Sequence, residues 1–283
     1  MILFLLITIA SLLQTTDPTY TRLVGEGWKV GETVITFAEP SLRDGQDAGS
    51  ERESLLKVVG TDRQLDEMLR DSVTAPFILK LRDVTAGDAI VRVADLYFAI
   101  HADLPNVKTE DVVRAKSGPP VEAGNMRFET RVLDPSEFLS QAIAPQDGTY
   151  YVHSSNRMLD RIQVESTDRV IATRGETSIV VSSQTDPRFD NDAKAPNRWR
   201  NLAKLGGLKE DGPSQVYKGA AGYVKVSKLK TQEGTLWVEV HFAFVEPRAW
   251  FDGAPILRSK LSLVAQDQIR RLRRELAKAK AAN

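Results

Sequence analysis

The chain of 283 residues contains no cysteine. Disulfide bonds, thiolate nucleophiles, cysteine-ligated zinc and iron–sulfur clusters are therefore excluded, and we expect no classical lipoprotein, because that class needs a cysteine to acylate. The chain also lacks an excess of charge, since 38 Lys and Arg residues balance 38 Asp and Glu residues. A neutral chain has no overall field that would attract nucleic acid or an anionic membrane. We therefore expect no nucleic-acid partner.

Familiar catalytic and cofactor motifs are missing as well. The sequence has no HExxH, Walker A, GxSxG or EF-hand pattern. Ser54–Lys57 and Ser227–Lys230 match the SxxK motif of penicillin-binding proteins, but no SDN-like or KTG element follows. The glycines of Gly25–Gly31 precede a predicted strand, whereas a nucleotide-binding loop follows one. We expect no cofactor and favour a non-enzymatic protein, with a hydrolase that has a dispersed site as an alternative.

The first residues form the longest apolar run. Ile2–Leu13 is interrupted only by Thr8 and Ser11, and polar residues follow it. A membrane-spanning helix needs about 20 apolar residues, whereas this length is typical of the central region of a secretory signal. No Lys or Arg precedes the run, and a first buried element of a cytoplasmic protein is the alternative interpretation. We expect residues 1–16 to be a signal peptide and the protein to be periplasmic or extracellular.

Residues 17–283 have the pattern of one α+β domain. Thr33–Glu39 alternates as a strand does, and two short helices are predicted over 51–59 and 62–71, with Asp62 at the N-cap. Further strands are predicted over 77–81, 90–101, 126–132, 215–229 and 235–245, with a short helix over 135–142. A meander of four short strands is predicted over 149–183, with turns at 156–157, 167–168 and 175–176. Long loops are predicted at about 105–125 and 185–213.

The last strand and the last helix have the clearest patterns. One face of 235–245 is apolar and consists of Leu236, Val238, Val240, Phe242 and Phe244. A helix from about Pro255 to Lys280 has an apolar stripe made of Leu257, Leu261, Val264, Ala265, Ile269, Leu272 and Leu276. Its opposite face is basic, with Arg258, Arg270, Arg271, Arg273 and Arg274. Such a helix could lie on an anionic membrane, but the strand face offers the stripe a partner, so we favour a packed helix.

This order of elements resembles the helix-grip architecture of the START and Bet v 1-like lipid-binding superfamily. A strand, a helix pair, antiparallel strands and a long C-terminal helix follow one another, and Gly222–Leu276 carries most of the likeness. The resemblance implies a curved antiparallel sheet that grips the C-terminal helix around a cavity. An apolar or amphipathic small molecule would then bind between sheet and helix, against Val240, Phe242, Phe244, Leu257 and Leu261.

Other polar residues suggest weaker alternatives. His101, His153 and His241 each lie on a predicted strand and could together bind zinc. Each is opposite the most apolar residues of its strand, which indicates a half-exposed histidine, so we predict no metal site. Asp186–Asp192 lacks the Gly and the closing Glu of a calcium loop.

A cell-envelope structural or interaction protein, with partners bound at the long loops near Trp199, is the alternative function.

The export prediction can be checked on protein purified from its native host. We expect N-terminal sequencing to begin after the apolar run, because a signal peptide is removed on export. An intact Met1 on protein from a soluble cytoplasmic fraction would contradict this prediction.

Overall fold

The structure, a computed structural model, describes residues 17–107, 120–123, 125–138, 141–203, 210–252 and 254–282. The apolar run and the predicted signal peptide lie outside the described residues, as does most of the predicted loop at 105–125. No helix within the described part of the chain is long and apolar enough to cross a membrane.

The described helices are α1 (Pro18–Gly25), α2 (Ala48–Val59), α3 (Asp62–Met68), α5 (Pro135–Phe138), α6 (Arg248–Phe251) and α7 (Ile256–Ala282). The 3₁₀ turns are η1 (Leu104–Asn106) and η3 (Pro187–Phe189). The first strands are β1 (Trp28–Val30), β2 (Thr33–Ile35), β3 (Ile78–Ala86), β4 (Ala89–His101), β5 (Val121–Ala123), β6 (Met126–Val132) and β7 (Thr149–Met158). The remaining strands are β8 (Ile162–Arg174), β9 (Ser178–Thr185), β10 (Arg198–Asn201), β11 (Gln215–Val216), β12 (Ala220–Lys228) and β13 (Thr235–Pro247).

Eleven strands form one antiparallel sheet. Its order is β3-β4-β13-β12-β9-β8-β7-β6-β5, with β10 added beside β8 and β11 beside β10. The hairpin β1–β2 stands apart as a separate two-stranded sheet. The predicted α+β class is confirmed, with a large antiparallel sheet, a helix pair and a long C-terminal helix packed against the sheet.

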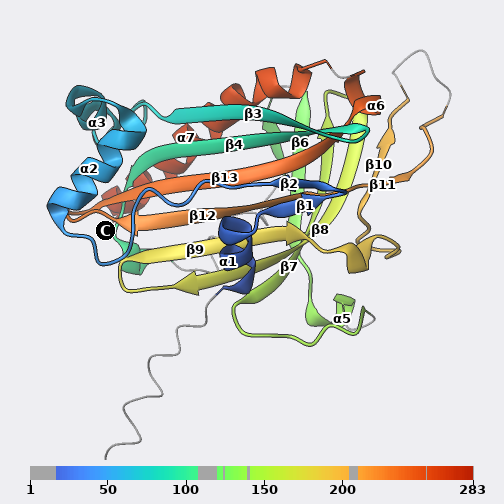
Figure 1. Cartoon of the computed structure of the whole chain (residues 1–283), viewed down its shortest axis with the longest axis horizontal. Coiled ribbons are helices and arrows are strands. Elements are labelled where there is room, and N and C mark those ends of the chain that lie inside the picture. The colour runs from blue at the N-terminus through green and yellow to red at the C-terminus, as the bar shows by residue number, and fades with distance from the viewer. Residues whose placement is uncertain are drawn as a thin grey trace, which may run out of the picture.

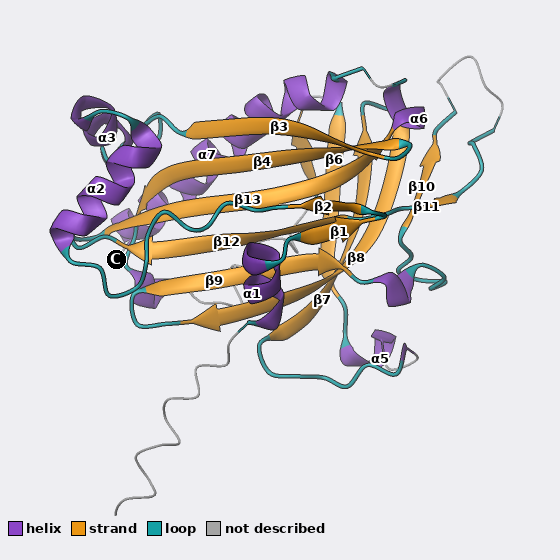
Figure 2. Cartoon of the chain, viewed as in Figure 1, coloured by secondary structure: helices purple, strands orange, loops and turns teal. Residues whose placement is uncertain are grey.

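Both faces of the large sheet are covered. Figure 1 shows α7 behind the sheet, and α1 with the β1–β2 hairpin in front of it. Figure 2 shows α2 and α3 together at one end of the sheet. We call the face toward α7 the inner face and the opposite face the outer face. The N-terminal segments thus bury a face that the sequence pattern had left half exposed.

Strand β13 shows the effect of this double cover. Its alternation is as predicted: Leu236 and Val238 belong to the cluster that contains Ile269 of α7. The residues between them are buried too, since Trp237, Glu239 and His241 are each 0% exposed on the outer face. The prediction of half-exposed histidines is therefore wrong for His241.

The helix pair begins and ends at residues with capping roles. The Asp47 side chain accepts hydrogen bonds from the backbone N–H groups of residues 49 and 50 at the start of α2. Gly60 ends that helix with a φ of 104°, a conformation that favours glycine. Thr61 is the N-cap of α3, so Asp62, predicted as the cap, is its first residue instead.

The meander has three strands where four were predicted. Thr167 and Asp168 do not form a turn but lie inside the thirteen-residue strand β8. The structure also places β10 inside the predicted loop at 185–213, paired with the first half of β8. The Asn197 side chain explains this order, because it is fully buried, accepts from the Thr167 backbone N–H and donates to the Asp186 carbonyl oxygen.

Helix α7 is rotated slightly from the predicted orientation in its second half. Ile269 is 3% exposed, but Leu272, predicted in the apolar stripe, is 36% exposed. The residue that faces the sheet after Ile269 is Arg273, predicted on the basic face and in fact 7% exposed. Its guanidinium donates to the carbonyl oxygens of Ala75, Pro76 and Ala99. Burial lowers its pKa below the ordinary value, and the carbonyl contacts compensate part of the desolvation.

Substitutions along α7 test this orientation. Ile269→Ala should lower the free energy of unfolding by about 2–5 kcal/mol, because it leaves a cavity in a packed core. Leu272→Ala and Arg271→Ala should each change it by no more than about 0.5–1 kcal/mol, since both side chains are exposed. Denaturant unfolding measures all three, and equal losses at 269 and 272 would contradict the observed rotation.

Candidate functional site

The inner face of the sheet divides into a solid half and a hollow half. In the solid half, large apolar side chains from six strands and Ile269 of α7 fill the space. Its buried members are Leu96, Phe98, Ile100, Leu104, Val152, Val170, Ile179, Val181, Val226, Leu236, Val238 and Ile269. The hollow half lies further along the same strands, beneath the first three turns of α7 and beside α6.

The hollow half contains a cavity of about 330 Å³. Its wall is mostly apolar, and β6, β7, β8, β12, β13, α6 and α7 contribute to it. The lining residues are Met126, Phe128, Ser154, Asn156, Met158, Val164, Ser166, Asp168, Tyr217, Ala220, Phe242, Phe244, Trp250, Leu257, Lys260, Leu261 and Val264. Apolar cavities of about 300–1,000 Å³ with a few polar groups are typical of small-molecule sites.

The change in side-chain size along β12 explains why this half is hollow. In the solid half, the inner face of β12 carries Val226, which is buried in the core cluster. Toward the cavity the inward positions become Gly222 and Ala220, which lie opposite Phe242 and Phe244 of β13. A Cβ atom at Gly222 would lie 2.3 Å from the carbonyl oxygen of His241. The close approach of the two strands therefore requires glycine, and no side chain fills the space.

Four of the five residues predicted for the cavity wall line this cavity. Phe242 and Phe244 lie on β13, and Leu257 and Leu261 lie on α7. Val240 does not, because it packs in the solid half of the inner face. The residues that sequence reasoning missed come from β6, β7 and β8, from the start of β12 and the residue Tyr217 before it, from α6 and from other positions of α7. They could not be assigned from alternation alone, since the strand order decides which strands lie beneath α7.

Aromatic residues close one end of the cavity. Trp250 of α6 stacks on Tyr217 and contacts Trp199 edge to face, with ring centroids 5.9 Å apart in both pairs. Trp199 is 4% exposed, so its ring belongs to this cluster and is not open to a partner. The Trp250 Nε1 atom is buried and has no hydrogen-bond partner among the described residues.

A buried ion pair fixes the sheet beside the cavity. The Arg92 guanidinium donates to both carboxylate oxygens of Glu246, at 2.7 and 2.8 Å, and both residues are at most 3% exposed. Arg92 also donates to Asp83, which accepts from Arg258 in the first turn of α7. These charges link β3, β4 and β13 to the start of α7. They therefore help to fix the distance between the helix and the sheet beside the cavity.

The outer face contains a second buried polar cluster. His241 Nδ1 is 2.7 Å from Asp95 Oδ1, and His241 Nε2 is 3.7 Å from Glu239 Oε2. The imidazole stacks on the ring of Tyr223 and meets the ring of Tyr97 edge to face. Although burial acts to lower it, the pKa of His241 is raised, because Asp95 and Glu239 bond to its charged form.

The N-terminal strap, residues 36–46, covers this polar cluster. The backbone N–H of Ser41 donates to Glu239 at 2.8 Å, and Tyr223 donates to the Ala38 carbonyl oxygen. Lys225 donates to the carbonyl oxygen of residue 42 and pairs with the carboxylate of residue 44 at 3.1 Å. These bonds attach the strap to the outer face of the sheet. None of the cluster residues is among those that line the cavity on the inner face.

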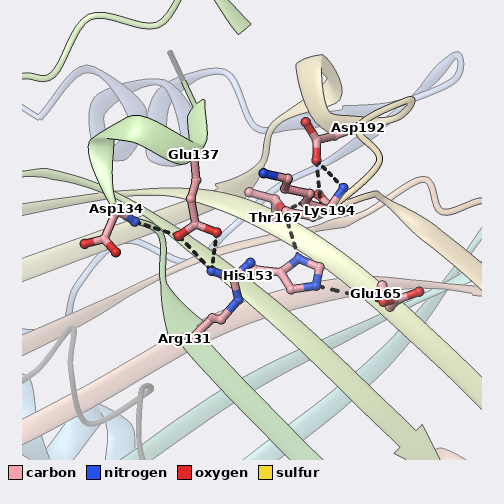
Figure 3. A network of polar contacts seen from close by, with 9 residues as sticks. Arg131, Asp134, Glu137, His153, Glu165, Thr167, Asp192 and Lys194 are labelled. Atoms are coloured by element: carbon pink, nitrogen blue, oxygen red, sulfur yellow. Dashed lines mark hydrogen bonds and ion pairs between the residues drawn. The ribbon is translucent and has the colours of Figure 1, made fainter. Parts of the chain in front are cut away.

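His153 lies in a third network, shown in Figure 3. Its Nδ1 atom is 3.0 Å from the Thr167 hydroxyl, which donates its own proton to the Ala195 carbonyl oxygen at 2.6 Å. The hydroxyl therefore accepts from His153, and the imidazole proton is on Nδ1. Burial, followed by the positive charge of Arg131, lowers the pKa of His153 to about 4. His153 is 7% exposed, so it is not half exposed as predicted.

The three histidines are not brought together. His101 is paired with Thr235 in the sheet, and His241 lies six residues further along β13, which is about 20 Å in a strand. His153 belongs to β7, on the other side of β12, β9 and β8. Within the described residues, no group of three His, Asp or Glu side chains could hold a metal ion.

The other sequence motifs have structural contacts. Ser54 of the first SxxK motif accepts a hydrogen bond from the Gln46 amide at 2.9 Å, and an amide donor cannot take up the proton of a nucleophile. Ser227 of the second motif is a buried residue of β12. In the loop Asp186–Asp192, the first carboxylate pairs with Arg188 and the last accepts from two backbone N–H groups.

Two larger hollows lie at the surface. One, of about 700 Å³, is beside α3, and the other, of about 500 Å³, is between α2 and the strap. Charged and polar side chains make up most of both linings. Neither hollow has the apolar lining that would bury an apolar molecule away from water, so the cavity under α7 is the better candidate site.

Comparison with known proteins finds a likeness among solved structures. No protein-family model and no curated protein matches the chain. Among solved structures, the chain is similar to the human StarD13 (DLC2) lipid transfer and protein localization domain. The TM-score is 0.38 and the sequence identity 9%, over 78% of this chain and 95% of that domain. The likeness is weak, and it shows no common function.

The two buried histidines predict opposite effects of pH on stability. The unfolded chain protonates His153 near pH 6.5, but the folded chain does so only near pH 4. Stability should therefore fall as the pH drops across this window, by up to about 1.4 kcal/mol per pH unit. The pKa of His241 is raised, so its contribution is complete below about pH 6.5 and is lost as the pH rises through its folded pKa.

Denaturant unfolding at a series of pH values measures both effects. The free energy of unfolding of His153→Gln should fall less between pH 6.5 and 4 than that of the wild-type protein. The free energy of unfolding of His241→Gln should fall less as the pH rises above about 6.5. Each variant is the control for the other. If His153→Gln loses as much stability between pH 6.5 and 4 as the wild-type protein does, the lowered pKa of His153 is contradicted.

Proposed function

We propose that the protein binds an apolar or amphipathic small molecule in the cavity between the inner face of its sheet and α7. The observation that carries this proposal is the change from a solid to a hollow inner face along the same strands. Val226 and Val238 fill one half, while Gly222 and Ala220 leave the other half open. Protein interiors are close-packed and contain few voids, so the retained space supports a binding role.

The composition of the wall supports this class of ligand. Phe242, Phe244, Leu261 and Val264 offer an apolar surface on two opposing elements, and burial of apolar area is the main driving force for binding such a molecule. The volume of about 330 Å³ is near the lower limit for small-molecule sites. A compact or single-chain molecule fits this space better than a lipid with two long chains.

Location and partner complete the proposal. The apolar run at 2–13 supports action outside the cytoplasm, in the periplasm or beyond. The interaction-protein alternative placed partners at the long loops near Trp199, and the buried ring of this residue is not available to them. No observation on the described residues favours the hydrolase alternative over binding.

Mass spectrometry of organic extracts from the purified protein tests the proposal directly. We expect an apolar or amphipathic molecule in the extract at a ratio approaching one per chain. Leu261→Trp should reduce the amount, because an indole in place of the half-buried Leu261 side chain occupies part of the cavity.

Leu263→Trp is the matched control. It lies on the same helix, and Leu263 is 47% exposed on the solvent side, so the extract should be unchanged. If the wild-type protein carries no molecule and takes up no apolar probe from solution, the cavity is not a binding site and the proposal fails.

A further inference from the structure

A smaller hollow, of about 160 Å³, lies on the outer face of the sheet, where α1 meets β8 and β9. Thr19 and Arg22 of α1, Arg169 of β8 and Gln184 of β9 are in its wall. Its volume is below the range of about 300–1,000 Å³ that is typical of sites for drug-sized molecules. The hollow therefore has room for a small ion or for the polar group of a larger molecule.

The sheet and α1 bring two guanidinium groups to this place. Arg169 is directly opposite Gln184 in the β8–β9 pairing, and both lie on the outer face, since Val170 and Val181 belong to the inner cluster. Opposed residues on one face have Cβ atoms about 4.5–5.5 Å apart. The Arg22 guanidinium donates to the side-chain oxygen of the same glutamine. Arg22 and Arg169 thus flank one residue from two different elements.

Neither guanidinium is paired with a carboxylate. Within the described residues, Arg22 has its bond to Gln184 and Arg169 has no side-chain hydrogen bond or ion pair. Both residues are half-buried. A guanidinium has five N–H donors, so most of the donors at this hollow are available to a ligand. Arg92 and Arg188, in contrast, each form an ion pair with a carboxylate.

The acidic groups near the hollow do not cancel its positive charge. Asp186 is in the wall, but both of its carboxylate oxygens accept from the Arg188 guanidinium. Asp17 precedes α1, and burial raises its pKa although Arg169 and several hydrogen bonds act to lower it. Three guanidinium groups therefore face two carboxyl groups, and the balance of charge favours an anion.

The arrangement of donors is suited to a tetrahedral anion. The planar fork of arginine matches the oxygens of a phosphate, and two such forks from different directions can bind different oxygens of one group. The Thr19 hydroxyl in the wall is a further donor. A carboxylate has only two oxygens and offers fewer acceptors to these donors. The set of residues therefore favours a phosphate over a carboxylate.

We propose that this hollow binds a phosphate group between the guanidiniums of Arg22 and Arg169. Free phosphate and the phosphate of a small monoester share this chemistry. The hollow is on the face of the sheet opposite to the cavity under α7, and no residue lines both. The inference is therefore independent of the proposed function, and either can fail without the other.

Three anions test the assignment. Calorimetric titration of the protein at neutral pH compares inorganic phosphate, glycerol 3-phosphate and acetate, with the ionic strength held constant by sodium chloride. We expect phosphate to bind at one site per chain and acetate to bind about tenfold more weakly, since each hydrogen bond to a charged group contributes roughly this factor. Tighter binding of glycerol 3-phosphate than of phosphate would identify a monoester as the ligand, and the reverse order would identify the free ion.

Substitutions of Arg169 separate the guanidinium fork from its charge. Arg169→Gln should weaken the binding of phosphate by at least about tenfold, because the charged donors are removed. Arg169→Lys keeps the charge and loses the fork, so it should restore only part of the affinity. Arg127→Gln is the matched control, because it removes the same charge from an exposed position on β6, which β7 separates from β8. It should leave the affinity within about twofold, since distant exposed charges are screened by salt.

Unfolding midpoints with and without phosphate show whether each variant folds and binds. Phosphate should raise the midpoint of the wild-type protein and of Arg127→Gln, but not that of Arg169→Gln, since a ligand stabilises only the folded state that binds it. Arg22→Gln is a second variant with the same expected loss. If acetate binds as tightly as phosphate, or if Arg127→Gln weakens phosphate as much as Arg169→Gln does, the hollow is not a phosphate site and the inference is wrong. The absence of any phosphate binding would also contradict it.

Discussion

The structure depends on the pairing of β4 with β13 at the centre of a sheet that is covered on both faces. The two strands match over thirteen residue pairs, from Thr235 with His101 to Pro247 with Ala89. Because α7 covers one face and the N-terminal segments cover the other, every side chain on this ladder has to be apolar or paired. Where burial is nearly complete, polar side chains are paired: Arg92 forms an ion pair with Glu246, and His241 forms one with Asp95.

The cavity is a consequence of how α7 lies on the inner face. Ile269 packs into the solid half, and Arg273 binds the carbonyl oxygens of Ala75, Pro76 and Ala99, so the second half of the helix is attached to β4 and to the segment before β3. At its start, Arg258 joins the charge network of Asp83 and Arg92. A straight helix held at both ends cannot move closer to the sheet where the β12 side chains become small, and the space beneath it stays open.

The covered outer face has a different role from the hollow inner face. The strap at 36–46 is held mainly by side chains that can ionise, which include Glu239, Tyr223 and Lys225. Glu239 Oε1 and His241 Nε2 are buried and have no hydrogen-bond partner among the described residues. Such groups cost stability. The core on this face is therefore polar and pH-sensitive, whereas the solid half of the inner face is a cluster of apolar side chains.

Much of the regular structure could be predicted from local patterns. The alternation of Leu236, Val238 and Phe242 identified β13 and its inner face, and the helical spacing of Leu257, Leu261 and Ile269 identified α7. The short elements α1, β1 and β10 were missed, because eight residues or fewer carry too little periodicity. Thr167 and Asp168 resembled a turn by composition, yet the neighbouring strands β7 and β9 hold them inside β8.

By itself, then, the sequence determined the α+β class, the main strands and the long amphipathic helix, since each of these follows from a repeat of two or of about 3.6 residues. Tertiary structure decided that His241 and His153 are buried, that Arg273 rather than Leu272 faces the sheet, and that Val240 lies in the solid half. It also decided that Ser154 of β7 and Ser166 of β8 are paired and that both line the cavity. These facts depend on strand order and on contacts between segments distant in the chain, and a local period contains no information about either.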